Sequence, residues 1–251
     1  MSGYLQAIGD GADIIVKLDG DGQMDPGHIP MVAGPLLDGY ADYAKGNRFY
    51  YLEGIYQMPL VRIAGNAALS FIAKFSTGYW DIFDPTNGFT AVQARVLERL
   101  PFSKIDKRYF FESDMLFRLN IIRAVVMDVP LPARYADEKS NLSVLHSIPE
   151  FAFKHLRNTI KRIFYNYYLR DFSAMSLELL LGIIAVLVGV GFGSFAWMRS
   201  VQTGVVATSG TVMLAGLPLI VGIQLLLSFL AADSANVPKI PIHRHLSSGP
   251  G

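Results

Sequence analysis

The chain has 251 residues, 22 basic against 21 acidic side chains and a net charge of +1, and 51% of its residues are hydrophobic. These values exclude a strongly basic nucleic-acid binder and a disordered chain, and the absence of cysteine excludes disulfides, thiolate metal sites and a cysteine nucleophile. Residues 172–238 contain only three charged side chains. The composition therefore predicts a globular part followed by a hydrophobic tail.

Strand and helix patterns alternate along the globular part. Short apolar runs predict strands at residues 12–18, 40–45, 88–92 and 124–129. Helical spacing of apolar residues predicts helices at residues 30–38, 57–75, 92–100 and 111–119. This alternation predicts an α/β fold in which helices cover both faces of a sheet.

An acidic loop follows the first predicted strand. Asp19, Asp21 and Gln23 offer oxygen ligands at alternating positions, with a glycine on either side of Asp21. Ligands of open α/β sheets bind beyond the carboxyl ends of strands, and Mg²⁺ or Mn²⁺ prefers oxygen ligands. We therefore expect a divalent cation that bridges this loop to phosphates. An EF-hand is excluded because Met24 occupies the glycine position, and the remaining alternative is an acidic turn that caps the next helix.

Residues 151–169 predict a basic amphipathic helix, because apolar side chains recur at helical spacing and basic ones lie largely on other faces. Such a helix either lies in a membrane interface or packs on the globular domain with its basic side chains in solvent.

Two uncharged apolar runs, residues 179–197 and 212–232, are each long enough to cross a bilayer, and the alternative is a pair of buried core helices. Basic residues flank the pair, whereas the connection contains only Arg199, which predicts a hairpin with the globular part and the C-terminus in the cytoplasm. Gly189 and Gly193 favour close helix contact, within the hairpin or between protomers of a homo-oligomer. The expected organisation is a globular domain, an amphipathic region, a hairpin and a flexible cytoplasmic tail, at residues 1–148, 149–172, 173–233 and 234–251.

Short motifs follow one another in order: DGDGQMDP at 19–26, KGNRF at 45–49, TNGF at 86–89, ESD at 112–114 and EKS at 138–140. This ordered set resembles family 2 inverting glycosyltransferases of GT-A fold, in the branch of dolichol-phosphate mannose synthase and the bacterial polyprenyl-phosphate glycosyltransferases. The resemblance covers residues 10–232. It implies a Rossmann-like mixed sheet with helices on both faces and two C-terminal transmembrane helices.

The resemblance implies transfer of a hexose from a nucleotide-diphosphate sugar, of UDP-glucose or GDP-mannose type, to undecaprenyl or dolichyl phosphate. Transfer would invert the anomeric carbon at the cytoplasmic face of the plasma membrane. Mg²⁺ or Mn²⁺ would be held by Asp19, Asp21 and Gln23. The other implied roles are donor binding by Asp19, Asp21, Asn87 and Gly88, catalysis by Asp114 with Glu112, and acceptor-phosphate binding by Arg48, Arg134 and Lys139.

Ordinary structural roles stay open beside these. Asn87 and Gly88 also suit a plain turn, and Arg48, Arg134 and Lys139 also suit solvated loop positions. The family's metal loop follows two βα units, whereas 18 residues precede Asp19 here. We therefore expect a fold that is incomplete at its N-terminus, which would leave this chain inactive in the extreme case. The alternatives are a non-catalytic paralogue that acts as a membrane partner, and a glycosyltransferase with a non-lipid glycan acceptor.

Overall fold

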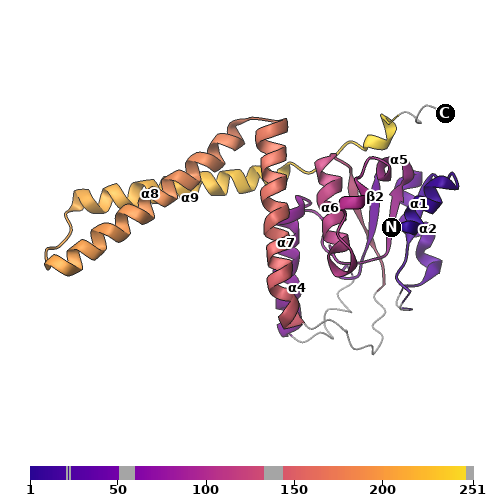
Figure 1. Ribbon diagram of the computed structural model, residues 1–251, viewed down its shortest axis with the longest axis horizontal. Coiled ribbons are helices and arrows are strands. Elements are labelled where there is room, and N and C mark those ends of the chain that lie inside the picture. The colour runs from indigo at the N-terminus through magenta and orange to yellow at the C-terminus, as the bar shows by residue number, and fades with distance from the viewer. Residues whose placement is uncertain (21, 23, 51–59, 133–143, 247–251) are drawn as a thin grey trace. The chain divides into compact units, whose positions relative to one another are not determined.

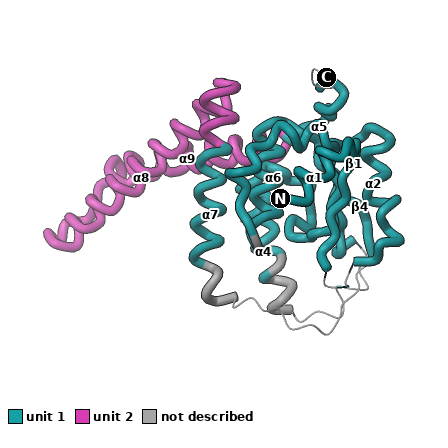
Figure 2. Tube along the Cα trace, turned by 45° about the vertical axis from the view of Figure 1, so that its right-hand side comes forward, with its two compact units in different colours: residues 1–162, 237–251 teal, residues 163–236 magenta. Residues whose placement is uncertain are grey.

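The computed structural model describes residues 1–20, 22, 24–50, 60–132 and 144–246 (Figure 1). The chain forms two compact units, Met1–Arg162 with Val237–Gly251, and Ile163–Asn236 (Figure 2). Each unit is described by itself below.

A mixed sheet forms the centre of the first unit. Within the described residues it has four strands in the order β1 (Ile14–Lys17), β3 (Thr90–Gln93), β2 (Tyr43–Asn47) and β4 (Val126–Pro130). β3 is antiparallel to β1 and β2, whereas β2 and β4 are parallel. Strands β1, β2 and β4 therefore run in one direction, so their carboxyl ends share one edge of the sheet with the start of β3.

Helices cover both faces of this sheet, as predicted. Side chains alternate along each strand, so Tyr43 and Val92 join a core with α1 (Ser2–Gly9) and α6 (Phe111–Ile121), whereas Ala44 and Ala91 join a core with α2 (Ile29–Leu37). Two covered faces explain why apolar and small residues predominate in the strands.

The predicted strands and helices of this unit are confirmed with shifted ends. α4 covers Leu60–Thr77, and the first residues of the helix predicted at 57–75 lie outside the described residues. α5 covers only Ala94–Leu97 of the predicted helix 92–100, because Val92 and Gln93 pair with β1. The described residues of this unit also form four short 3₁₀ helices, η1 (Pro26–His28), η2 (Phe102–Lys104), η3 (Arg108–Phe110) and η5 (Ile242–Arg244).

Helix α1 was not expected from the sequence. It has eight residues, a length at which an isolated helix is marginal in water. Its buried Tyr4 stacks on Phe111 of α6, with ring centroids 6.3 Å apart. Tertiary packing therefore stabilises a helix that local sequence alone does not specify.

Helix α7 (Val144–Phe164) presents its polar side to the rest of the first unit. His155, Asn158, Thr159 and Arg162 are buried, whereas a stripe of three apolar side chains is more than half exposed, namely Phe153, Leu156 and Ile160. The helix thus packs on the globular domain, but its basic side chains are not simply solvated. Exposed apolar patches are typical of surfaces that meet a partner or a membrane.

Residues 237–246 return to the first unit and form a C-terminal strap, where the sequence predicts a flexible tail at 234–251. Asp42, which is fully buried, accepts bonds from the backbone N–H groups of Ile242 and His243, both 2.9 Å long. It also accepts from His243 Nδ1 at 2.7 Å and from the Val125 N–H at 2.7 Å. Three of these four hydrogen bonds to the Asp42 carboxylate come from the strap. They satisfy a buried charged group and so hold the strap against the first unit.

The second unit contains the π-helix η4 (Tyr165–Arg170) and the helices α8 (Ala174–Thr203) and α9 (Ser209–Ala235). α8 and α9 are long and apolar enough to cross a membrane, and only 11% of the most apolar window of each is buried. This low burial argues against soluble core helices.

A Cβ at Gly189 would lie 2.9 Å from Ala215 O, and one at Gly222 would lie 2.8 Å from Val186 N. The glycines therefore let the two helices of the hairpin pack with their backbones close together.

Candidate active site

The carboxyl-terminal edge of the sheet gathers most of the described residues that the sequence singled out. Asp19 follows β1, Arg48 follows β2, and Asn87 and Gly88 precede β3. Glu112 reaches the same edge from the first turn of α6. This edge is where ligands bind in open α/β sheets.

One ammonium group organises the acidic part of this edge. Lys17 Nζ lies 2.7 Å from Asp19 Oδ1, 3.0 Å from Glu112 Oε1 and 3.4 Å from the carbonyl oxygen of Gly88. Burial by itself would lower the pKa of Lys17, but the hydrogen bond to Asp19 and the charge of Glu112 raise it above its ordinary value. Lys17 is therefore a permanent cation between two carboxylates.

Gly88 lies directly against the carboxylate of Asp19. A Cβ at Gly88 would lie 2.6 Å from Asp19 Cγ and would overlap the carboxylate oxygens. Lys45, which is fully buried, donates to the carbonyl oxygen of Asn87, and the Asn87 side chain accepts from the Phe89 N–H at 3.0 Å. Burial lowers the pKa of Lys45 to about 8. The turn at residues 87–88 is thus fixed from both sides, and only glycine fits beside Asp19.

A second group of charges surrounds Arg48. Its guanidinium makes two bonds to the fully buried Asp84, Nε to Oδ2 at 2.8 Å and Nη2 to Oδ1 at 3.2 Å. Burial would raise the pKa of Asp84, but Arg48 holds it below its ordinary value. Nearby, Asp128 Oδ2 accepts from Asn47 Nδ2 at 3.0 Å, and burial raises the pKa of Asp128 to about 6. Arg48 is thus oriented by Asp84, with 38% of its side chain exposed.

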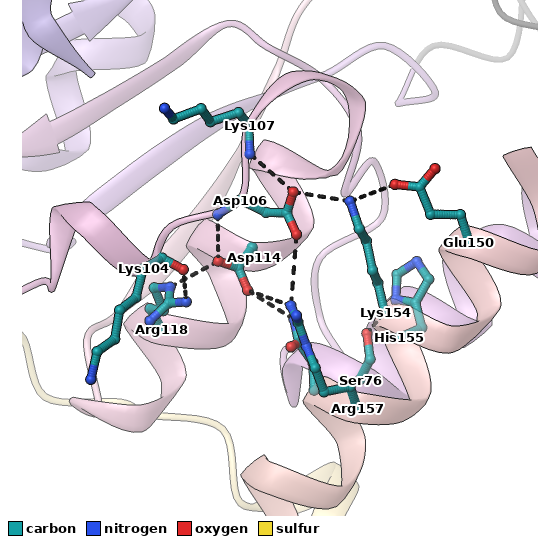
Figure 3. Close-up of polar contacts among 11 residues, drawn as sticks. Ser76, Lys104, Asp106, Lys107, Asp114, Arg118, Glu150, Lys154, His155 and Arg157 are labelled. Atoms are coloured by element: carbon teal, nitrogen blue, oxygen red, sulfur yellow. Dashed lines mark hydrogen bonds and ion pairs between the residues drawn. The ribbon is translucent and has the colours of Figure 1, made fainter.

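Asp114 lies elsewhere, although it is only two residues from Glu112. Its buried carboxylate accepts from Arg118 Nε at 2.8 Å, from the Asp106 N–H at 2.9 Å and from Asn158 Nδ2 at 3.1 Å (Figure 3). Arg157 Nη2 approaches it to 4.0 Å. These contacts of Asp114 join α6 to α7, and none of these four partners is a group that contacts Asp19.

Figure 3 shows that the polar contacts around Asp114 continue along α7. Lys154 Nζ lies 3.0 Å from Asp106 Oδ1 and 2.8 Å from Glu150 Oε1. Ser76 Oγ of α4 and His155 Nδ1 share a 2.7 Å hydrogen bond, and burial lowers the pKa of His155 to about 4. Polar contacts thus attach α7 to both α4 and α6.

Four predicted site residues lie outside the described residues: Asp21, Gln23, Arg134 and Lys139. Their expected roles stay predictions. Among the residues that the structure describes, no group of three or more His, Asp or Glu side chains is arranged to hold a metal ion. Asp19 is the described member of the predicted ligand set, and its side chain is 43% exposed, so its carboxylate is accessible. Carboxylate and amide oxygens at residues 19, 21 and 23 suit Mg²⁺ or Mn²⁺ in their chemistry.

Sequence reasoning missed four charged residues at this edge, Lys17, Lys45, Asp84 and Asp128. Lys17 and Lys45 are the charged members of otherwise apolar or small-residue strands. A charge in a buried strand costs free energy unless a partner compensates it, and this was the available signal. Asp128 gave the same signal, because it is the charged residue of the apolar strand β4, whereas Asp84 lies in the connection between α4 and β3 and gave none.

The first unit is an α/β domain with a polar edge at its strand ends, and comparison with known proteins indicates its family. The sequence model of glycosyl transferase family 2 matches residues 2–100, so this part of the chain is a domain of that family. Two of the curated relatives are named for lipid-linked sugar transfer. The chain is 31% identical over 137 residues to the UDP-N-acetylglucosamine–dolichyl-phosphate N-acetylglucosaminyltransferase of Methanococcus voltae, covering 55% of this chain and 54% of that protein.

The chain is also 28% identical over 135 residues to the polyprenol monophosphomannose synthase of Mycolicibacterium smegmatis, covering 52% of this chain and 49% of that protein. The chain therefore spans about half the length of the curated relatives it matches. The predicted resemblance to family 2 and to its prenyl-phosphate branch is confirmed.

Proposed function

We propose that this protein transfers a hexose from a nucleotide-diphosphate sugar to a polyprenyl phosphate, at the cytoplasmic face of the plasma membrane. The observation that carries the proposal is the strand-end site, where Asp19 is fixed between Lys17 and Gly88 with Glu112 beside it. The two relatives named above support the same class of reaction.

The donor binds at Asp19, Asp21, Asn87 and Gly88 in this proposal. The buried turn at residues 87–88 has no side chain beside Asp19, so the Asp19 carboxylate packs directly against this turn where the donor is expected to bind. Asp19, Asp21 and Gln23 would hold Mg²⁺ or Mn²⁺, which supplies positive charge for a leaving diphosphate.

The acceptor phosphate binds Arg48, together with Arg134 and Lys139. Asp84 holds the Arg48 guanidinium from one side, so its remaining exposed part is oriented in advance. A phosphate monoester has a second pKa of about 6 and is mostly dianionic at pH 7, so a strong general base is unnecessary. Direct displacement at the anomeric carbon by this anion inverts the configuration.

Of the two acidic residues in α6, Glu112 suits a role next to the donor. It lies beside Lys17 at the strand-end edge, where its charge can stabilise an oxocarbenium-like transition state. Asp114 is fully buried and bonded to three donors. We assign Asp114 to the attachment of α6 to α7 in place of the catalytic role expected from the sequence.

The membrane part of the proposal rests on α7, α8 and α9. α8 and α9 would span the bilayer, and the exposed stripe of Phe153, Leu156 and Ile160 would enter its interface. A lipid-linked acceptor phosphate is found at that interface.

Membranes that contain the full chain should test the function with labelled UDP-N-acetylglucosamine, UDP-glucose and GDP-mannose in the presence of Mn²⁺. We expect label in a charged lipid fraction, its loss in Asp19→Asn, and its retention in the matched control Asp38→Asn, which changes an exposed aspartate after α2. Label found only in a polymer would indicate a non-lipid glycan acceptor. No transfer with any donor would indicate a non-catalytic paralogue.

A further inference from the structure

The proposed function assigns Lys17 neither to donor binding nor to catalysis, yet its ammonium group contacts several of the residues at the site. Three oxygen atoms from three separate segments converge on its ammonium group: Asp19 Oδ1, Glu112 Oε1 and the Gly88 carbonyl oxygen. The ammonium also lies 5.5 Å from the centroid of the Phe111 ring. Its side chain is 25% exposed and that of Glu112 is 15% exposed, so this contact is largely shielded from water.

The ammonium group of Lys17 compensates the negative charges of both Asp19 and Glu112. Both bond to the same nitrogen, so without Lys17 two like charges would stand close together in a partly buried place. One of them would then turn towards solvent. Asp19 is the more exposed partner, with 43% of its side chain accessible, and it follows β1 in a loop, whereas Glu112 lies in the first turn of α6.

Asp19 is also limited on its other side. Gly88 is packed so closely that a Cβ there would lie 2.6 Å from Asp19 Cγ. Lys17 attracts the carboxylate through Oδ1, and the turn at residues 87–88 blocks its movement away. The carboxylate is therefore held in one orientation before any ligand arrives.

The geometry points to Lys17 as a positioning residue that fixes Asp19 and Glu112 together in the arrangement that receives the sugar nucleotide. This inference rests on the proposed function, because it assigns Asp19 to donor binding. Lys17 acts through the two carboxylates and is not itself a catalytic residue. A purely structural ion pair between β1 and α6 would stabilise the fold without affecting donor affinity, and the test below separates the two.

The test compares the full chain in detergent with Lys17→Met, which removes the charge and keeps the length of the side chain. Equilibrium binding of UDP, GDP, UDP-N-acetylglucosamine and GDP-mannose is measured with Mn²⁺ present, and binding of Mn²⁺ alone is measured separately. We expect Lys17→Met to weaken binding of the preferred nucleotide by about tenfold or more, the loss of a charge-assisted hydrogen bond. The matched control Lys107→Met alters an exposed lysine and should bind like the wild type.

The double variant Lys17→Met with Glu112→Gln removes the cation together with one of the two anions. We expect it to recover part of the affinity lost in Lys17→Met, because Asp19 then faces no like charge. Lys17→Arg, which keeps the charge and can bridge two carboxylates, should stay within about threefold of the wild type. If Lys17→Met does not fold, Lys17→Gln replaces it and must show the same loss.

The outcomes are distinguishable. Wild-type affinity in a folded Lys17→Met, with only its melting temperature reduced, would overturn the positioning role and leave the glycosyltransferase proposal intact. Failure of the wild-type protein to bind any of the four nucleotides would overturn the proposed function and this inference with it.

Discussion

Two acidic residues of one short motif, Glu112 and Asp114, serve different parts of the molecule. Positions i and i+2 of an α-helix are roughly 200° apart around its axis, so their side chains leave opposite sides of α6. Glu112 faces the strand-end edge and bonds to Lys17. Asp114 faces α7 and bonds to Arg118 and Asn158. Two acidic residues of one helical motif that are two positions apart therefore do not imply one shared site.

The two regions also differ in how their charges are compensated. The carboxylate of Asp19 is 43% exposed and bonds to a lysine, which leaves it able to meet a ligand. The carboxylate of Asp114 is fully buried and accepts from a backbone amide, a guanidinium and a side-chain amide. We therefore expect changes around Asp114 to act on stability and changes around Asp19 to act on donor binding.

The largest effect is expected from Asp114→Ala. Arg118, Asn158 and the Asp106 N–H would lose their acceptor in a buried place, and breaking a buried pair in this way costs about 3–5 kcal/mol of unfolding free energy. Thermal unfolding of the full chain in detergent measures the change. Glu112→Gln is the comparison variant and should cost less stability than Asp114→Ala, because Lys17 keeps Asp19 and the Gly88 carbonyl oxygen as partners. Equal losses in both variants would remove the distinction between the two regions.

A smaller effect on the unfolding free energy is expected when the pH is lowered, through His155. This residue lies in α7, the helix that Asp114 joins to α6. Its pKa is about 4 in the folded protein because burial disfavours the charged ring, against about 6.5 in an unfolded chain. Between these values only the unfolded chain takes up the proton, so stability falls as pH drops from about 6.5 to about 4 and is constant above. The full shift corresponds to about 3 kcal/mol.

The measurement is the unfolding free energy of the wild type and of His155→Gln between pH 4 and pH 8. The variant should lose this part of the pH dependence, while donor binding at pH 7 stays unchanged. A wild-type profile that matches the variant throughout would contradict a neutral, buried His155.

The third effect concerns the strand-end region alone. Gly88→Ala should reduce kcat/KM by about a hundredfold, equivalent to about 2.7 kcal/mol, because the new methyl group displaces the Asp19 carboxylate. Gly34→Ala is a matched control, since a Cβ there meets nothing within 4 Å and the residue lies inside α2. Kinetics with the donor identified by the membrane assay test this expectation. An active Gly88→Ala enzyme would show that Asp19 tolerates displacement.

Much of the fold was predictable because each element has a local cause. Ile14, Ile15 and Val16 form an apolar run that favours a buried strand, and the uncharged lengths of α8 and α9 specify apolar helices. Helix α1 and the C-terminal strap were not predicted, because both depend on partners far away in the sequence. Tyr4 packs on Phe111, and His243 bonds to Asp42.

The candidate site was predictable only in part. The spacing of oxygen ligands drew attention to Asp19, and the short turn motif drew attention to Gly88. Neither alternative for the helix at residues 151–169, in a membrane interface or packed with its basic side chains in solvent, anticipated Lys154 bonded to Asp106. Amphipathic spacing does not say which face meets the protein.

The sequence by itself determined the α/β alternation, the acidic loop and the apolar hairpin, since these follow from residue type and period. Only the tertiary structure decided that Lys17 joins Asp19 to Glu112, that Asp114 belongs to another region and that the strap covers Asp42. The physical reason is that charge compensation depends on distance in space, whereas sequence spacing fixes distance only within one element.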